Sequence, residues 1–467
     1  MILIGINVFI MPDDTLGGAN QLSLLIASAI ACAIALKNGI KWKTIESRIV
    51  HTVSVATSSI LILLIIGLLS GTWMLCGIVP TMIYYGLKII TPDYFLPATI
   101  IIAAIISVMV GSSWSTVATV GVALLGIGRA LGFEDGLIAG AIISGAYFGD
   151  KISPLSDTTN LAAAIAKVPI FTHIKYMMQT TVPTFLISLA IFLLISIFKT
   201  EVDINLTNNE IEAIIASKYN ISPFLLLVPL TVVVLIAKKV PTVIVLFLGG
   251  ILGGLVTLVA QPQLISELSG EGTMTLKGSY EVISRAMFAS TNISTGNSSV
   301  DSLLTTNGMY GMLNTVWLVL TAMIFGGVLE AGHFLTRLIN AIESKVKSPG
   351  MAVTTTATTS ILFNFASGDQ YMAIVVPGKM SLPLFERLNL RPELLSRTLE
   401  DSGTVTSVLI PWNTCGAAQS ATLGVATMTY APFAVFCYLS PVVTLIYAWL
   451  KIKIKHNNTD SDDKENN

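Results

Sequence analysis

Long apolar segments separated by short polar stretches follow one another along most of this 467-residue chain. They lie near residues 20–36, 52–72, 135–167, 180–198, 222–237, 240–260, 311–330, 392–426 and 428–450. Most of them approach or exceed the roughly 20 residues that a helix needs to cross the hydrocarbon core of a bilayer. The pattern therefore predicts an all-α polytopic membrane protein, whose backbone polar groups are satisfied within its own helices.

Two further apolar segments, 96–130 and 351–386, are interrupted halfway by small and polar residues. The interruptions read GSSWST from Gly111 and NFASGDQ around Gly368. Irregular backbone at membrane depth is tolerated only where it is buried in protein or lines a cavity. We therefore expect each segment to form a re-entrant hairpin, with its tip in the wall of a binding site.

The stretch from Gly145 to Ala162, GAYFGDKISPLSDTTNLA, places two aspartates, a lysine and several hydroxyl and amide side chains within apolar sequence. A charge at that depth costs about 2.5–3.5 kcal/mol even on lenient insertion scales. Pro154 also removes a backbone donor, so we expect the helix to break there and to offer free carbonyl oxygens to a ligand.

The distribution of basic residues predicts the topology, because cytoplasmic loops carry an excess of Lys and Arg. The residues that mark cytoplasmic loops are Lys37, Lys41, Lys43, Arg48, Lys167, Lys175, Lys238, Lys239, Arg337, Lys345, Lys347, Lys451, Lys453 and Lys455. The polar loops 199–221 and 261–310 then face outward, provided that 73–90 and 331–347 lie along the membrane surface. The first hairpin opens outward and the second inward, so their tips meet near the midplane.

The chain also repeats itself at an offset of 257 residues, which carries 111–160 onto 368–417 and pairs Gly111 with Gly368 and Pro154 with Pro411. We therefore predict two inverted repeats, each with about five transmembrane helices, one re-entrant hairpin and one discontinuous helix. Secondary transporters have this architecture and bind their ligands at the repeat interface.

The repeats would comprise residues 1–198 and 222–450, joined by the extracytoplasmic loop 199–221 and followed by a disordered cytoplasmic tail, 451–467. The second repeat includes the extracytoplasmic loop 261–310. Residues 1–10 make only half a span, so we expect either a short first helix or a start upstream of Met1.

Composition agrees with a membrane protein, since 53% of the residues are hydrophobic and 11% charged, against about 25% charged in soluble domains. The net charge of −1 gives no indication of nucleic-acid binding. The four cysteines form no CxxC pair, which argues against a disulfide framework or a zinc site. No cofactor is expected.

The motifs GDKISPLSDTTNLA, GSSWSTVATVG, FNFASGDQYMAIVVPGKM and LEDSGTVTSVLIPWNTCGAAQSATLG resemble those of the NhaC-type Na⁺/H⁺ antiporters of the ion transporter superfamily. The resemblance extends from about residue 20 to residue 450. It implies a secondary antiporter that exchanges H⁺ for Na⁺, as a homodimer in the bacterial inner membrane. Some relatives exchange organic anions, such as malate for lactate, with the same ions, so the substrate stays open.

Sodium is a hard cation that prefers oxygen ligands, and the interrupted segments are rich in them. From the broken helix and the first hairpin tip, the candidates are Ser156, Thr158, Thr159, Asn160, Ser112, Ser113, Ser115 and Thr116. From the second half, they are Asn413, Thr414, Asn364, Ser367 and Gln370.

Antiport also requires a group that holds either a proton or the cation. Burial of a carboxyl group raises its pKa from about 3.9 towards neutrality, where protons compete with Na⁺. The candidates are Asp157, then Asp150, then Asp369. Alternatively, Lys151 neutralises Asp150 as an ion pair.

Glu400 and Asp401 are predicted to form an accessory proton relay, or else a salt bridge to Arg397.

Other functions were weighed against exchange of Na⁺ and H⁺. An intramembrane protease is disfavoured because the histidines are assigned to loops and helix ends and no HExxH motif occurs. A channel is disfavoured because inverted halves imply alternating access. A Na⁺- or H⁺-coupled exchanger of organic acids or amino acids remains the alternative, although no arginine at the tips or breaks offers a bidentate partner for a carboxylate.

Overall fold

The computed structural model describes residues 17–198, 208–291, 293–334, 337, 346–454 and 456. Over these residues the fold is all-α, with an isolated antiparallel bridge between Leu390 and His456. Residues 1–10, most of the tail and part of the loop 199–221, for which predictions were made above, lie outside the described residues.

The helices of the first half are α2 (Ala19–Lys37), α3 (Trp42–Leu75), α4 (Ile78–Ile89), α5 (Pro92–Val110), α6 (Ser113–Thr116), the π-helix η2 (Val117–Gly121), α7 (Val122–Ala130), α8 (Asp135–Ile152), α9 (Asp157–Ile165) and α10 (Ile170–Phe198). Those between the halves and in the following polar loop are α11 (Asn208–Lys218), η3 (Pro223–Leu226), α12 (Leu227–Ala237), α13 (Thr242–Ala260), α14 (Pro262–Ser269), α15 (Leu276–Phe288), α16 (Ser298–Leu303) and η4 (Gly308–Met312). The remaining helices are α17 (Leu313–Ala331), α19 (Pro349–Ser367), α20 (Met372–Arg387), α21 (Pro392–Leu399), the π-helix η5 (Glu400–Thr404), η6 (Ser407–Leu409), α22 (Thr414–Leu423), α23 (Thr427–Tyr430), η7 (Ala431–Phe433) and α24 (Val435–Trp449).

Six of the described helices are long and apolar enough to cross a membrane, or up to eight spans if each of two bent helix pairs forms one. Large apolar side chains such as Leu22, Ile30 and Leu186 are more than half exposed on their outer faces. Such surfaces are suited to contact with lipid. The prediction of an all-α polytopic membrane protein is therefore confirmed.

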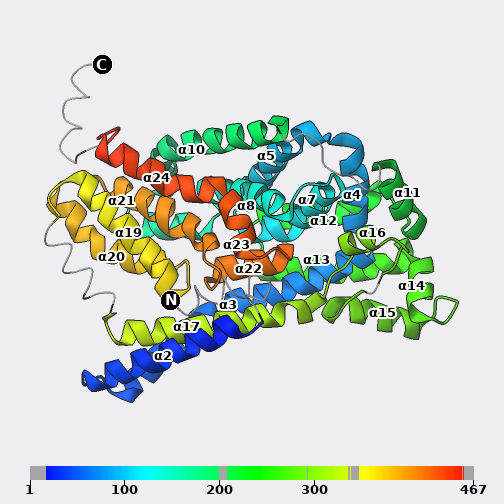
Figure 1. The fold of residues 1–467 in the computed structure, drawn as a ribbon, viewed down its shortest axis with the longest axis horizontal. Coiled ribbons are helices and arrows are strands. Elements are labelled where there is room, and N and C mark those ends of the chain that lie inside the picture. The colour runs from blue at the N-terminus through cyan, green and yellow to red at the C-terminus, as the bar shows by residue number, and fades with distance from the viewer. Residues whose placement is uncertain are drawn as a thin grey trace.

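The helices form two groups (Figure 1). In the first group, α3 packs against α13 and α17, and α17 packs against α2. In the second, α8 packs against α5, while α24 packs against α10 and α19. The short helix α22 of the second group contacts both α3 and α17, so the second group packs against the first.

Both predicted helix breaks are present, and local chemistry explains them. Between α8 and α9, residues 153–156 leave the helix at Pro154, and the Ser156 side chain caps α9 by accepting from the Thr159 amide. In the second half, Asn413 caps α22 in the same way, accepting from the Cys415 amide at 3.0 Å. Capping side chains satisfy amides that a new helix leaves without a partner.

Both hairpin tips turn at a glycine with left-handed backbone, Gly111 (φ 70°) after α5 and Gly368 (φ 65°) after α19. Adding 257 to the bounds of α5 gives the bounds of α19, and the same offset carries the first residues of α8 and α9 onto those of α21 and α22. This coincidence supports the predicted repeat, whose inverted orientation in the membrane stays a prediction. Re-entry of the hairpins also stays a prediction, since α5 alone is long enough to span.

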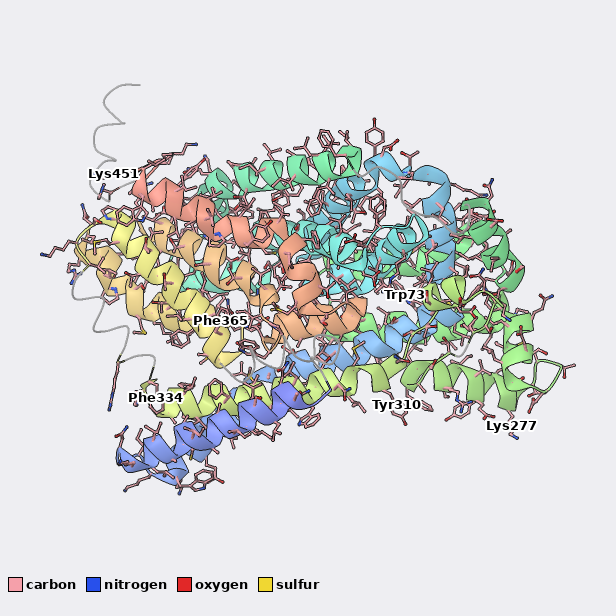
Figure 2. The ribbon with its side chains drawn as sticks, in the orientation of Figure 1. Trp73, Lys277, Tyr310, Phe334, Phe365 and Lys451 are labelled. Atoms are coloured by element: carbon pink, nitrogen blue, oxygen red, sulfur yellow. The ribbon has the colours of Figure 1, made fainter. Side chains whose placement is uncertain are left out.

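Residues assigned to opposite sides of the membrane lie toward opposite ends of the molecule, along its longest axis. Figure 2 shows Lys451 and Phe334 toward one end and Lys277, in the loop predicted to face outward, toward the other. Of the two segments expected along the membrane surface, 73–90 forms the end of α3 and the helix α4. Most of 331–347 lies outside the described residues.

Candidate functional site

A cavity of about 800 Å³ lies between the two halves of the chain. The first half contributes α3, the first hairpin tip and the α8–α9 break, and the second half contributes the α12–α13 turn, the second hairpin tip and Thr414. Of the predicted site residues, it is lined by Ser112, Ser113, Ser115, Asp150, Ser156, Asp157, Thr158, Asn160, Gln370 and Thr414. The remaining predicted residues do not line it: Thr116, Thr159, Asn364, Ser367, Asp369 and Asn413, and the accessory Lys151, Glu400 and Asp401. The fold thus brings parts of both halves together around one cavity.

Asp157 begins α9 and its side chain is exposed in this cavity. Its carboxylate has no hydrogen-bond partner among the residues that the structure describes. Next to it, the hydroxyls of Ser156 and Thr158 lie 3.1 Å apart. A carboxylate without a partner, beside hydroxyl oxygens and open to the cavity, can accept a hard cation or a proton.

Asp150 is held differently. It is 7% exposed, and its Oδ2 accepts from the backbone amide and the hydroxyl of Ser113, at 3.0 and 2.7 Å. These bonds tie the end of α8 to the first hairpin tip. Asp150 therefore positions the tip as well as contributing negative charge to the cavity.

Several predicted ligands brace the breaks, and of these Asn160 also lines the cavity. Thr159 donates to the Lys151 carbonyl at 3.0 Å, and the Asn160 amide donates to the carbonyls of Pro154 and Ser156. In the second half, Asn413 donates to Asn364, which in turn donates to the Gly403 carbonyl. These side chains satisfy carbonyls that the breaks expose.

Two other predicted residues stabilise the second hairpin tip. Asp369 is 1% exposed and accepts from the Met372 amide at 2.9 Å, and Ser367 donates to the Phe363 carbonyl. The tip is joined to its break by the Thr414 amide, which donates to the Gly368 carbonyl at 2.8 Å. Asp369 thus has a local capping role and lies outside the cavity.

Among the polar lining residues that sequence reasoning missed are Ser58 and Ser59 of α3, Tyr371 at the second tip, Lys239 in the α12–α13 turn and Thr242 at the start of α13. The adjacent serines within an apolar span were the available signal. The charged residues of the lining are Asp150, Asp157 and Lys239, so the cavity favours a cation.

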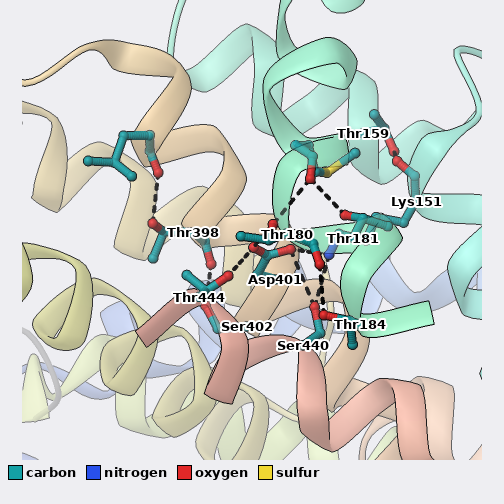
Figure 3. Close-up of polar contacts among 12 residues, drawn as sticks. Lys151, Thr159, Thr180, Thr181, Thr184, Thr398, Asp401, Ser402, Ser440 and Thr444 are labelled. Carbon is teal, nitrogen blue, oxygen red and sulfur yellow. Dashed lines mark hydrogen bonds and ion pairs between the residues drawn. The ribbon is translucent and has the colours of Figure 1, made fainter. Parts of the chain in front are cut away.

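Lys151, next to Asp150, points away from the cavity into a buried polar cluster (Figure 3). Its Nζ pairs with Asp401 of η5 and donates to Ser440 at 2.9 Å. Asp401 also accepts from Thr180 and Thr444. The alternative in which Lys151 neutralises Asp150 is therefore replaced by a pair that joins the two halves of the chain.

Arg397 forms no ion pair with Glu400 or Asp401 among the described residues, so the alternative salt bridge is not found. Its guanidinium lies 5.0 Å from the Tyr176 ring centre. His173 is fully buried in α10, with Nδ1 2.7 Å from the Ser396 hydroxyl. His173 thus lies in the first turn of α10, near a helix end as predicted, but its burial was not anticipated.

A family model described as "Na+/H+ antiporter family" matches residues 145–452 of this chain. The chain belongs to that family. Two Na⁺/H⁺ antiporters named NhaC are each 36% identical to it: that of Alkalihalophilus pseudofirmus over 93% of this chain and 91% of the relative, and that of Bacillus subtilis over 92% of each. A malate-2H⁺/Na⁺-lactate antiporter of B. subtilis is 34% identical over 92% of this chain and 89% of the relative.

Membership of the Na⁺/H⁺ antiporter family makes this chain a multi-pass membrane transporter. The motif at Gly145–Ala162, from which the resemblance was recognised, lies at the start of the matched region.

Proposed function

We propose that the protein exchanges Na⁺ for H⁺ across the bacterial inner membrane by alternating access, with Asp157 as the exchange site. The observation that carries this proposal is the unpartnered Asp157 carboxylate, exposed in a cavity to which both hairpin tips and both broken segments contribute. Proton and Na⁺ compete there because the binding of one positive charge disfavours the second.

The cavity extends from the hairpin tips to Lys239 in the α12–α13 turn, a loop assigned to the cytoplasm by its basic residues. In this conformation, Na⁺ would enter from the cytoplasm and bind Asp157 with the Ser156 and Thr158 hydroxyls. Movement of the second helix group against the first would then expose the site to the outside, where a proton replaces the ion.

The accessory roles follow from the same geometry. Asp150 would hold the hairpin tip near the ion, and Lys151 with Asp401 would join the moving segments of the two halves. Glu400 and Asp401 remain proposed as an accessory proton relay, which the exchange of Na⁺ for H⁺ at Asp157 does not require. Assembly as a homodimer rests on the family resemblance.

A second candidate function is Na⁺- or H⁺-coupled exchange of an organic acid or amino acid. The cavity volume favours it, because about 800 Å³ lies within the roughly 300–1,000 Å³ typical of small-molecule sites and exceeds what a single ion needs. An amino acid would place its ammonium group against Asp157. A dicarboxylate is less suited, since among the described residues Lys239 is the sole cation of the lining and no arginine belongs to it.

The test uses purified protein in liposomes that report internal pH, to which Na⁺ is added alone and then together with malate, lactate or amino acids. We expect Na⁺ alone to drive proton movement and Asp157→Asn to abolish it. Asp135→Asn is the matched control, because Asp135 lies at the other end of α8 in a surface pair with Arg129 at 2.8 Å. A response that requires an organic acid selects the second candidate, and full exchange by Asp157→Asn removes that residue from the mechanism.

A further inference from the structure

Glu400, the first residue of the π-helix η5, is completely buried, and neither oxygen of its carboxyl group has a hydrogen-bond partner among the described residues. Buried carboxylates are otherwise paired or hydrogen-bonded, since desolvation of an isolated charge is costly. The polar neighbour of Glu400 is the hydroxyl of Thr404, one turn further on, and their contact falls short of hydrogen-bond geometry. This residue therefore differs from Asp401, whose charge is satisfied by Lys151 and three hydroxyls.

The surface of α19 that packs against η5 adds more buried oxygens. Thr356 and Ser360 are fully buried, and their hydroxyls have no hydrogen-bond partner in the described part of the chain. They share a helical face with Asn364, whose amide donates to the Gly403 carbonyl at 2.6 Å. Unpaired polar atoms gathered at one helix interface indicate a site that takes up protons or water.

Arg397 lies one turn before Glu400 and is also fully buried, and none of its three guanidinium nitrogens has a hydrogen-bond partner in the described part of the chain. Because Lys151 and Asp401 neutralise each other, the net charge of the cluster depends on Glu400. The charge of Arg397 is met by the Tyr176 ring, a contact that also stabilises a cation, so Arg397 does not depend on an ionised Glu400.

Ser396 on α21, the helix that precedes Glu400, and His173 and Tyr176 on α10 place polar side chains between Glu400 and Lys453, which belongs to the end of the molecule assigned to the cytoplasm. One turn before Glu400, the Ser396 hydroxyl contacts His173 Nδ1, while His173 Nε2 is buried without a hydrogen-bond partner. Further out on α10, the Tyr176 hydroxyl donates to the Lys453 carbonyl at 2.9 Å. Like Lys151, these side chains lie outside the cavity that Asp150 and Asp157 line.

The other elements that pack against η5 are α9, α20, α21 and α24. Their ionisable residues, with Arg397 omitted, are Asp157 on α9, Lys379, Glu386 and Arg387 on α20, Glu393 on α21, and Cys437, Tyr438 and Tyr447 on α24. Lys379, Glu386 and Arg387 are exposed. Through-space interaction with Glu400 comes from Lys151, Asp150 and Asp401.

We propose that Glu400 is a second proton-binding site, which exchanges its proton with the cytoplasm through Ser396 and His173. Each cycle then carries a proton on Glu400 in addition to the one that replaces Na⁺ at Asp157. This inference rests on the proposed Na⁺/H⁺ exchange and extends it to two protons for each Na⁺, which makes transport electrogenic.

The test measures the membrane potential at which Na⁺-coupled proton flux stops, in proteoliposomes with fixed Na⁺ and pH gradients. We expect the flux through the wild type to stop at the membrane potential that corresponds to two protons per Na⁺. Glu400→Gln should keep Na⁺-driven exchange, but its flux should stop at the potential that corresponds to one proton per Na⁺. Glu400→Asp, which retains the acid, should keep the wild-type ratio. Glu386→Gln, an exposed glutamate on α20, is the matched control.

A one-to-one ratio in wild type, or equal ratios in wild type and Glu400→Gln, overturns the role of Glu400. Absence of Na⁺-driven flux in wild type overturns the proposed function instead. If Glu400→Gln is folded but inactive, infrared titration of the carboxyl C=O band decides whether Glu400 binds a proton. Loss of one titrating band relative to wild type supports the proposal, and an unchanged titration refutes it.

Discussion

Lys151 at the end of α8 and Asp401 in η5 form a fully buried ion pair across 250 residues of chain. Asp150, the immediate neighbour of Lys151, faces the opposite way, into the cavity. The last turn of α8 thus carries one carboxylate towards the proposed ion site and one ammonium group towards the second half. Any movement of η5 relative to α8 acts on the turn that holds Asp150.

Removal of one partner of this pair should destabilise the protein strongly. Lys151→Met leaves Asp401 buried without its countercharge, and we expect a loss of about 3–5 kcal/mol in the free energy of unfolding. The measurement is unfolding of the purified protein in detergent, followed by circular dichroism. The double variant Lys151→Met with Asp401→Leu should lose less than either single variant, because no lone charge remains buried.

The surface pair Arg129–Asp135 gives the contrast. Arg129→Met should cost only about 1 kcal/mol, since ion pairs that are partly open to solvent contribute little. Equal losses for Lys151→Met and Arg129→Met would mean that the buried pair does not stabilise the fold.

Gly111 should not tolerate a side chain. It has φ 70°, and an added Cβ would lie 2.5 Å from the Cβ of Leu155 in the helix break. We expect Gly111→Ala to lose about 2–4 kcal/mol from backbone strain and overpacking together, and to lower transport by displacing the tip from Asp150.

Gly424 separates these two causes, because it has φ 65° but nothing within 4 Å of an added Cβ. Gly424→Ala should therefore show the backbone strain alone, about 1–2 kcal/mol. If both alanine variants were equally stable and equally active, close contact between tip and break would be unimportant.

The Ser113 hydroxyl should affect ion binding more than stability. Ser113→Ala removes the 2.7 Å bond to Asp150 but keeps the bond from the backbone amide. Loss of a hydrogen bond to a charged group is worth about 1.5–3 kcal/mol, so we expect the KM for Na⁺ to rise by about tenfold or more. Transport kinetics in liposomes check this, with the exposed Ser217→Ala as control; an unchanged KM would show that Asp150 does not depend on the tip.

Lys239 should distinguish the two candidate functions. Lys239 lines a cavity that also holds two carboxylates, so Lys239→Gln should strengthen binding of a cation and lower its KM several-fold at low salt, with a smaller effect at high salt. The opposite change, a higher KM for an organic acid, is expected if a carboxylate is carried.

Lys238→Gln is the matched control, since Lys238 is adjacent in the turn but does not line the cavity. Equal effects of the two substitutions would assign the result to general surface charge.

The hairpin tips and the helix breaks follow from local chemistry that can be read along the chain. Gly111 and Gly368 allow left-handed turns, Pro154 and Pro411 remove backbone donors, and the capping residues restart the helices. For the same reason, the all-α membrane fold and the placement of Asp157 beside a break were predictable. Each feature depends on residue types within one or two helical turns.

The use of each polar side chain was decided only by tertiary structure. Thr159, Asn160, Asn364 and Asn413 have the oxygen atoms of ion ligands, but the folded chain directs their donors to backbone carbonyls. The partner of Lys151 lies 250 residues away and not at the adjacent Asp150, because successive side chains on a helix point in different directions. Sequence order shows which groups are available, whereas the packing of distant helices determines which of them meet.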